Sequence, residues 1–103
     1  ARYINSGGAL TLKTRTITAT GSPASSDYLI LCDATSGAIT LNLPAAASSI
    51  GRVLVIKKID ASGNTVTIDG NGAETIDGAA TKVLSAQYAI VNIQCDGATW
   101  WII

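Results

Sequence analysis

Few side chains in this 103-residue sequence could perform chemistry: its carboxylates, two cysteines and a handful of aromatic residues. Histidine is absent, which excludes Ser-His-Asp and Cys-His nucleophile pairs and most zinc arrangements. Asp69, Glu74 and Asp77 lie together in the Gly-rich segment 68–78 (IDGNGAETIDG). A glycosidase holds two carboxylates about 5–10 Å apart across a sugar-sized cleft. The short loops of this sequence leave little material for such a cleft, so we expect these carboxylates to cap turns.

The same segment has some resemblance in composition to a calcium-binding loop. An EF-type loop requires Gly at its sixth position and flanking helices. Counted from Asp69, the sixth residue is Glu74, and the flanking sequence is not helical. We therefore expect no metal or other cofactor, and we predict that the protein is not an enzyme.

The two cysteines, Cys32 and Cys95, each end an apolar segment and are each followed by Asp. A disulfide between them requires the two strand ends to be neighbours, which similar positions in sequence do not establish. Their apolar contexts favour buried free thiols instead. Both interpretations stay open from sequence.

Adjacent residues on a strand point to opposite faces, so one of Trp100 and Trp101 enters the core and the other is exposed, covers an edge or meets a partner. An exposed Trp suits a protein interface or the face of a sugar ring. We expect further contacts from the apolar N-terminal segment. The predicted contact residues are Arg2, Tyr3, Ile4, Leu10, Leu12, Tyr88, Trp100 and Trp101.

Composition limits the fold and the partners. Apolar residues make up 48% of the sequence, whereas Phe and Met are absent and aromatic residues reach only 5%. The core must therefore consist of Val, Ile, Leu and Ala, which suits sheets better than helices. Seven basic residues balance seven acidic ones, which argues against a nucleic acid partner. No segment approaches the roughly 20 apolar residues of a membrane helix.

Short alternating segments bounded by Gly, Asn, Asp and Pro predict an all-β domain, a compact antiparallel sandwich or jelly-roll-like barrel of short hairpins. A helical turn is plausible only near residues 45–50, after Pro44 ends a strand. Asp96-Gly97 predicts a hairpin. The expected strands are 10–20 (kinked near 13–16), 27–33, 38–43, 52–59, 65–69, 74–76, 81–84, 89–95 and 99–103.

A faint internal repeat is present. Residues 33–37 (DATSG) lead into Ile39-Thr40-Leu41, and residues 60–63 (DASG) lead into Val66-Thr67-Ile68. In both units an Asp beside the turn can accept hydrogen bonds from the backbone that follows. Reuse of favourable turn chemistry explains the repeat without invoking duplication.

An ordered series of motifs resembles a module found in structural proteins of tailed bacteriophages. The series is 27–30 (DYLI), 33–37 (DATSG), 43–46 (LPAA), 51–53 (GRV), 56–58 (IKK), 64–68 (NTVTI), 74–78 (ETIDG), 84–85 (LS) and 96–103 (DGATWWII). The resemblance covers residues 27–103. Residues 1–26 lie outside it and form an N-terminal arm and first strand, an attachment segment in this interpretation.

This resemblance implies a non-enzymatic virion protein that forms a homotrimer. We expect a capsid decoration (cement) protein that binds the major capsid protein and stabilises the head shell of a virion assembled in the host cytoplasm. The alternative is a tail fibre or tailspike domain that binds bacterial surface glycans. We expect residues 1–103 to be an entire small protein, with a fragment of a longer fibre as the alternative.

Overall fold

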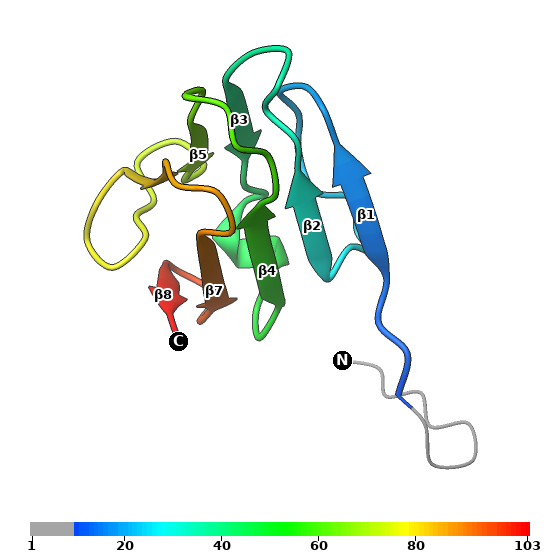
Figure 1. Cartoon of the computed structure of the whole chain (residues 1–103). Helices are drawn as coiled ribbons and strands as arrows, with labels where there is room; N and C mark the ends of the chain where they lie inside the picture. Colours follow the sequence, from blue (N-terminus) through cyan, green and yellow to red (C-terminus); the bar gives the residue numbers. More distant parts are fainter. Residues whose placement is uncertain (1–9) are drawn as a thin grey trace.

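Eight short strands separated by turns form two sheets around one core in the computed structural model, which describes residues 10–103 (Figure 1). The strands are β1 (Thr14–Ile17), β2 (Leu29–Cys32), β3 (Ile39–Asn42), β4 (Val53–Lys58), β5 (Val66–Asp69), β6 (Thr81–Leu84), β7 (Ile90–Cys95) and β8 (Trp100–Ile102). One 3-10 turn, η1 (Ala46–Ser48), follows Pro44. The all-β class and the helical turn near residues 45–50 are thus confirmed.

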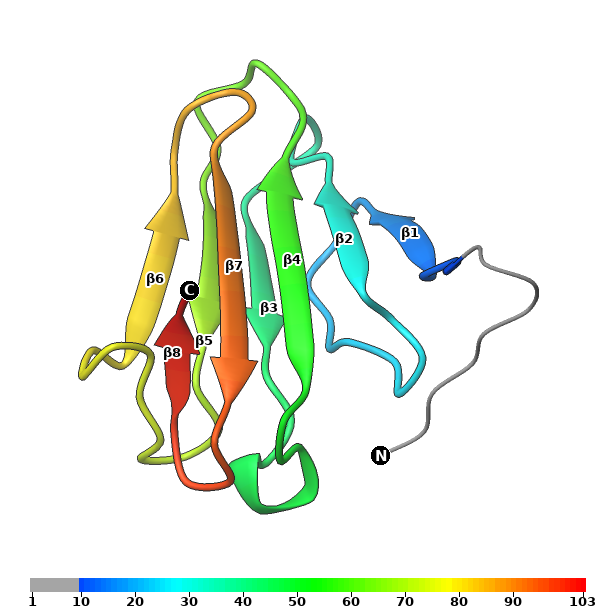
Figure 2. The same ribbon diagram turned by 90° about the horizontal axis from the view of Figure 1, so that it is seen from below.

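Strand direction differs from the prediction. One sheet has the order β1-β2-β4-β7-β8 and the other β3-β5-β6 (Figure 2). β1, β2 and β4 are parallel, as are β3 and β5, whereas β6, β7 and β8 pair antiparallel to their neighbours. The expected antiparallel sandwich is therefore wrong in this respect. The path of the chain explains the parallel pairing. Strands β2 to β5 alternate between the two sheets, so each strand that returns to a sheet runs in the same direction as the previous strand of that sheet.

Through β2 to β5 the chain winds from one sheet to the other and back, and we call each such turn a coil. The coils are stacked and have similar lengths. Leu29 of β2 pairs with Val55 of β4, and Ile39 of β3 pairs with Val66 of β5, so equivalent positions are 26 or 27 residues apart. Asp33 and Asp60, which mark the internal repeat, have the same spacing. The two repeat units therefore lie one above the other in adjacent coils, with their strands paired in register.

A buried polar cluster joins these two coils where the repeat units turn. Lys58 is fully buried and its Nζ lies 2.8 Å from Oδ2 of Asp60. Oδ1 of Asp60 accepts the backbone N–H of Ala34 at 2.7 Å, and the side-chain amide of Asn64 donates to the Ala34 carbonyl at 2.8 Å. The Ser62 hydroxyl donates to Asp60 as well. The ion pair and these hydrogen bonds thus offset the free-energy cost of burying the polar groups.

The core between the sheets is aliphatic, as the composition predicts. Alternate residues of each central strand are fully buried, among them Ile30, Leu41, Leu54 and Ile68. Trp100 is the largest of the buried side chains. Inward residues of both sheets belong to one cluster, so a single core joins the two layers.

The C-terminal strands close one end of the coil stack. β7 and β8 form the predicted hairpin, in which Gly97 adopts a φ of 99° that favours glycine. The expected strand at 74–76 is reduced to two isolated bridges, from Ile76 to Ala79 and from Ile76 to Trp100. Even so, this segment bonds to the outer edge of β8, because the N–H of Trp100 donates to the Thr75 carbonyl at 3.0 Å.

Candidate interaction surface

The outward face of the five-stranded sheet is apolar over β2 and most of β4 and mixed elsewhere. Six of its eleven outward positions are apolar, and the other five are Thr14, Thr16, Lys57, Asn92 and Gln94. Along β2, β4, β7 and β8 the residues that alternate with the core positions point away from the second sheet. The apolar residues of this face are Leu29, Leu31, Val53, Val55, Ile90 and Trp101. Lys57 is the only ionisable side chain at an outward position in the five strands of this sheet. We call this surface the apolar face.

The outward face of the three-stranded sheet has the opposite character. Its outward positions are Thr40, Asn42, Thr67, Asp69, Thr81 and Val83, five of which are polar. A sheet that faces water usually carries such residues on its solvent side. The contrast indicates that the three-stranded sheet faces solvent, whereas the apolar face has the composition of a contact surface.

One end of the apolar face carries a rigid aromatic residue. Tyr88 precedes β7 and is 62% exposed, with a φ of 68°, which is rare for a side chain of this size. Its backbone is held on both sides. The N–H of Tyr88 donates to the backbone carbonyl of Lys58, and the carbonyl of Tyr88 accepts from the Lys57 ammonium at 3.3 Å. The same ammonium lies 5.6 Å from the centre of the tyrosine ring. The backbone of Tyr88 is therefore fixed, and its ring faces a nearby cation.

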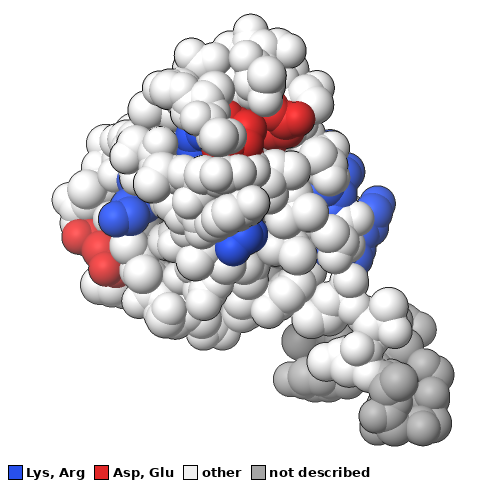
Figure 3. All heavy atoms as spheres, viewed as in Figure 1, with Lys and Arg blue, Asp and Glu red and all other residues white. Residues whose placement is uncertain are grey.

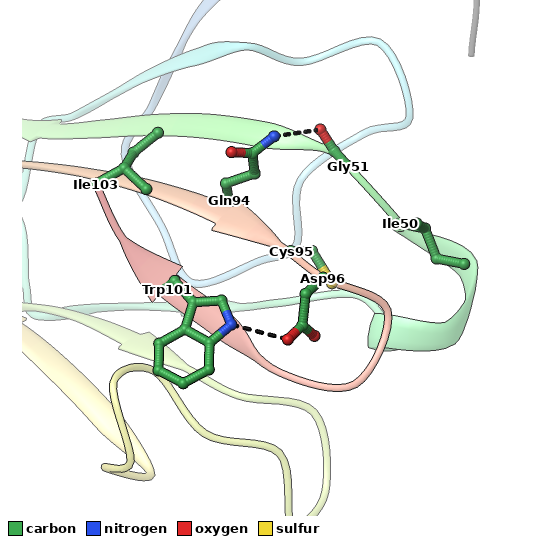
Figure 4. Close-up of a pocket in the computed structure, with 7 residues that line it drawn as sticks. All are labelled: Ile50, Gly51, Gln94, Cys95, Asp96, Trp101 and Ile103. Carbon is green, nitrogen blue, oxygen red and sulfur yellow. Dashed lines mark hydrogen bonds between the residues drawn. The ribbon is translucent and has the colours of Figure 1, made fainter.

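At the edge of the same face near β8 there is an open groove of about 400 Å³ (Figure 4). It is lined by Ile50, Gln94, Cys95, Asp96, Trp101 and Ile103. Ile50 is the most exposed of these apolar side chains at 74%. It is brought here because the N–H of Gly51 donates to the Cys95 carbonyl at 2.8 Å, which places the turn after η1 beside the end of β7. We call this site the Trp101 groove.

Asp96 fixes the indole of Trp101. Its Oδ2 accepts the indole N–H at 2.9 Å, while its Oδ1 accepts the backbone N–H groups of Ala98 and Thr99 (Figure 4). These hydrogen bonds, above all the one from Trp101, lower the pKa of Asp96, so the carboxylate stays charged. Trp101 is 48% exposed. The groove therefore has a preformed aromatic wall with a negative charge at its rim.

Two of the three carboxylates considered for catalysis or calcium binding, Glu74 and Asp77, accept backbone hydrogen bonds. Glu74 accepts the N–H of Ala46 at the start of η1 at 3.0 Å, and Asp77 accepts the N–H of Ile102 at 2.9 Å. Within residues 10–103, no group of three or more potential ligands is placed to hold a metal ion. Glu74 and Asp77 thus cap backbone donors, although the donors belong to distant segments rather than to their own turns.

Both cysteines are free and buried, which agrees with the thiol interpretation rather than the disulfide. Burial, together with the nearby charge of Asp60, raises the pKa of Cys32 to about 11. Its thiol is therefore protonated at neutral pH and unreactive. Cys95 lines the Trp101 groove but is only 2% exposed.

Four of the predicted contact residues are exposed: Leu10, Leu12, Tyr88 and Trp101. Trp100 is fully buried in the core, so the alternation rule holds and a contact role for this residue is wrong. The predicted residues Arg2, Tyr3 and Ile4 lie outside the described part of the chain.

Sequence reasoning missed the aliphatic part of the surface, including Ile50, Ile90 and Ile103. The alternation in 89–95 leaves every second residue outward, which is a usable signal for Ile90. By contrast, Ile50 reaches the groove only through long-range backbone pairing.

Charge is dispersed over the molecule. On the side drawn in Figure 3, acidic and basic side chains of the described residues are few and separated by uncharged surface. No helix within residues 10–103 is long and apolar enough to cross a membrane. No protein-family model matches this sequence, and no curated protein shows significant similarity to it.

Proposed function

We propose that this protein is a non-enzymatic structural component of a larger assembly. The observation that carries this proposal is the contrast between the two outer faces, one apolar and one polar, on a domain with a net charge of zero. A neutral domain whose outer sheet face carries half-buried apolar side chains at its centre has little charge repulsion to keep it apart from partners. Association would cover the apolar face and gain ~25 cal/mol for each Å² of apolar surface removed from water.

The assembly that fits best is the virion of a tailed bacteriophage. The ordered motifs in residues 27–103 support this choice. In this role the protein is a homotrimeric capsid decoration protein bound to the major capsid protein. Because it binds the assembled shell and not free subunits, it stabilises the shell by mass action.

Counting copies in purified particles tests this proposal. The chain should be present in many dozens of copies relative to the major shell protein by quantitative mass spectrometry, and gold-labelled antibodies should decorate the head. Removal of the protein should make heads release their DNA at lower temperature. A few copies confined to the tail, or none in the particle, would contradict a decoration role.

A tail fibre domain that binds surface glycans is the second candidate. The observation that favours it is the half-exposed indole of Trp101, which donates a hydrogen bond to Asp96 beside an open groove. Such a ring is a suitable stacking surface for a sugar. Binding of host surface polysaccharide that is lost in Trp101→Ala, together with a tail location, would select this function over decoration.

A further inference from the structure

Two groups of exposed apolar residues lie at opposite edges of the five-stranded sheet. One group is the pair Leu10 and Leu12, which are 70% and 45% exposed and precede β1. The other is the wall of the Trp101 groove beside β8. β1 and β8 are the two outermost strands of this sheet. Figure 1 shows the residues just before β1 running away from the folded body. From here on, the arm means residues 10–13, the described part of the N-terminal segment that precedes β1.

The arm does not lie in the groove of its own chain. The backbone carbonyl of Lys13 accepts the N–H groups of Tyr28 and Leu29, which holds the base of the arm beside β2. A fully extended chain spans at most ~3.6 Å per residue, so Leu10 lies within about 11 Å of Lys13. The strands that line the groove, β7 and β8, are three and four strand spacings from β1, or about 14 and 19 Å at ~4.8 Å each. The arm of another copy can bring these leucines to the groove without releasing the Lys13 hydrogen bonds.

The arm and the groove also match in chemistry. In an extended segment Leu10 and Leu12 share one side, and Thr11 and Lys13 share the other. The leucines would contact Ile50, Trp101 and Ile103, while the exposed Lys13 would lie near the rim, where Asp96 is charged. The apolar side of the arm thus meets apolar walls. The long side chain of Lys13, on the opposite side, can reach the anion at the rim.

We propose that the arm of one copy docks in the Trp101 groove of the next, so that copies join head to tail. Such a contact uses two different surfaces of each chain, and it closes into a ring when the rotation between copies allows. Three copies would complete the trimer on which this inference rests. The arm then links neighbouring subunits, rather than gripping the shell.

Variants at both surfaces test the contact. Leu10→Asp/Leu12→Asp and Trp101→Ala should each weaken self-association about 30-fold or more, the loss expected for an anchor side chain. Ile103→Asp provides a second groove variant at an exposed C-terminal position. Val83→Asp is the matched control, since Val83 is 48% exposed, like Trp101, but lies on the polar face. Analytical ultracentrifugation measures the oligomer, and circular dichroism checks folding.

A mixing experiment tests whether the contact is head to tail. The arm variant keeps an intact groove, and Trp101→Ala keeps an intact arm, so an equimolar mixture should form a heterodimer through one complete contact. Separately, Leu12→Cys/Ile103→Cys should form intermolecular disulfides under mild oxidation with diamide. The pair Leu12→Cys/Val83→Cys should not, and Cys32 and Cys95 give little background because both are buried.

The outcomes separate this contact from the proposed function. A trimer that persists in both the arm and groove variants overturns the contact but leaves the trimer intact. If the arm variant stays trimeric and loses only its binding to particles, the arm contacts the shell instead. A wild-type chain that is monomeric at all concentrations overturns the trimer itself.

Discussion

Two buried carboxylates, Asp27 and Asp60, are each paired with a basic residue. Burial raises the pKa of Asp27, but its hydrogen bonds with Arg15 and with the Ala24 backbone outweigh this, so the pKa is lowered overall. At Asp60, hydrogen bonds from Lys58 and Ser62 hold the pKa well below its usual range. Both carboxylates are therefore more stable charged in the folded protein than in the unfolded chain.

Acid should destabilise the protein through these carboxylates. A pKa that is lower in the folded state contributes stability above the ordinary value of 3.8, and this contribution is lost as the pH falls below that value. Asp60→Asn should be less stable than wild type at about pH 7, because Lys58 loses its buried partner, and the difference should shrink at about pH 3. Urea denaturation at both pH values measures it.

Asp33→Asn is the control for this prediction, since Asp33 occupies the equivalent turn of the preceding coil but binds only Thr35. It should change stability little at either pH. A difference between Asp60→Asn and wild type that stays constant from neutral to acidic pH would contradict the role given to Asp60.

The backbone of a neighbouring segment packs so closely against Gly70 that no side chain fits at this position. A Cβ at this position would lie 2.3 Å from the backbone oxygen of Glu74. Gly70→Ala should therefore lower the free energy of unfolding by about 1–3 kcal/mol, as overpacking does. Gly63→Ala is the control, because a Cβ there meets nothing within 4 Å. Equal stabilities of the two variants in thermal denaturation would refute this explanation.

Among the strands, the contrast between the two sheets leads to a further prediction. Val55→Lys places a charge at the centre of the apolar face, whereas Thr67→Lys places one on the polar face. We expect Val55→Lys to fold but to lose binding to particles by tenfold or more, which corresponds to about 1.4 kcal/mol. Co-sedimentation with particles stripped of the protein measures this binding.

Thr67→Lys should bind as wild type does. If both lysine variants bind equally well, the apolar face is not the contact surface. If Thr67→Lys alone fails to bind, the contact lies on the three-stranded sheet instead.

The folded domain is small, and a domain of this size gains only modest stability from its own core. Subunit association should therefore add measurably to stability. For a trimer, the melting temperature should rise by about 4–7 °C for each tenfold increase in protein concentration. Differential scanning fluorimetry over a hundredfold concentration range tests this. A melting temperature independent of concentration would indicate that the folded unit is the monomer.

Local patterns were sufficient for the β class, for most strand positions and for the turn at η1. Alternation of apolar and polar residues and the turn preferences of Gly, Asn, Asp and Pro act over a few residues, so they can be read along the chain. The opposite environments of Trp100 and Trp101 follow from the same alternation. The buried thiols of Cys32 and Cys95 agree with their apolar contexts.

Strand direction and the composition of the groove depend on contacts that no local pattern reports. Alternation looks the same in a parallel and an antiparallel strand, so the sequence did not reveal that β2 and β4 run in the same direction. The Trp101 groove exists because backbone hydrogen bonding between Gly51 and Cys95 brings Ile50 beside β8. Pairings over such separations are set by how the whole chain buries its apolar residues together.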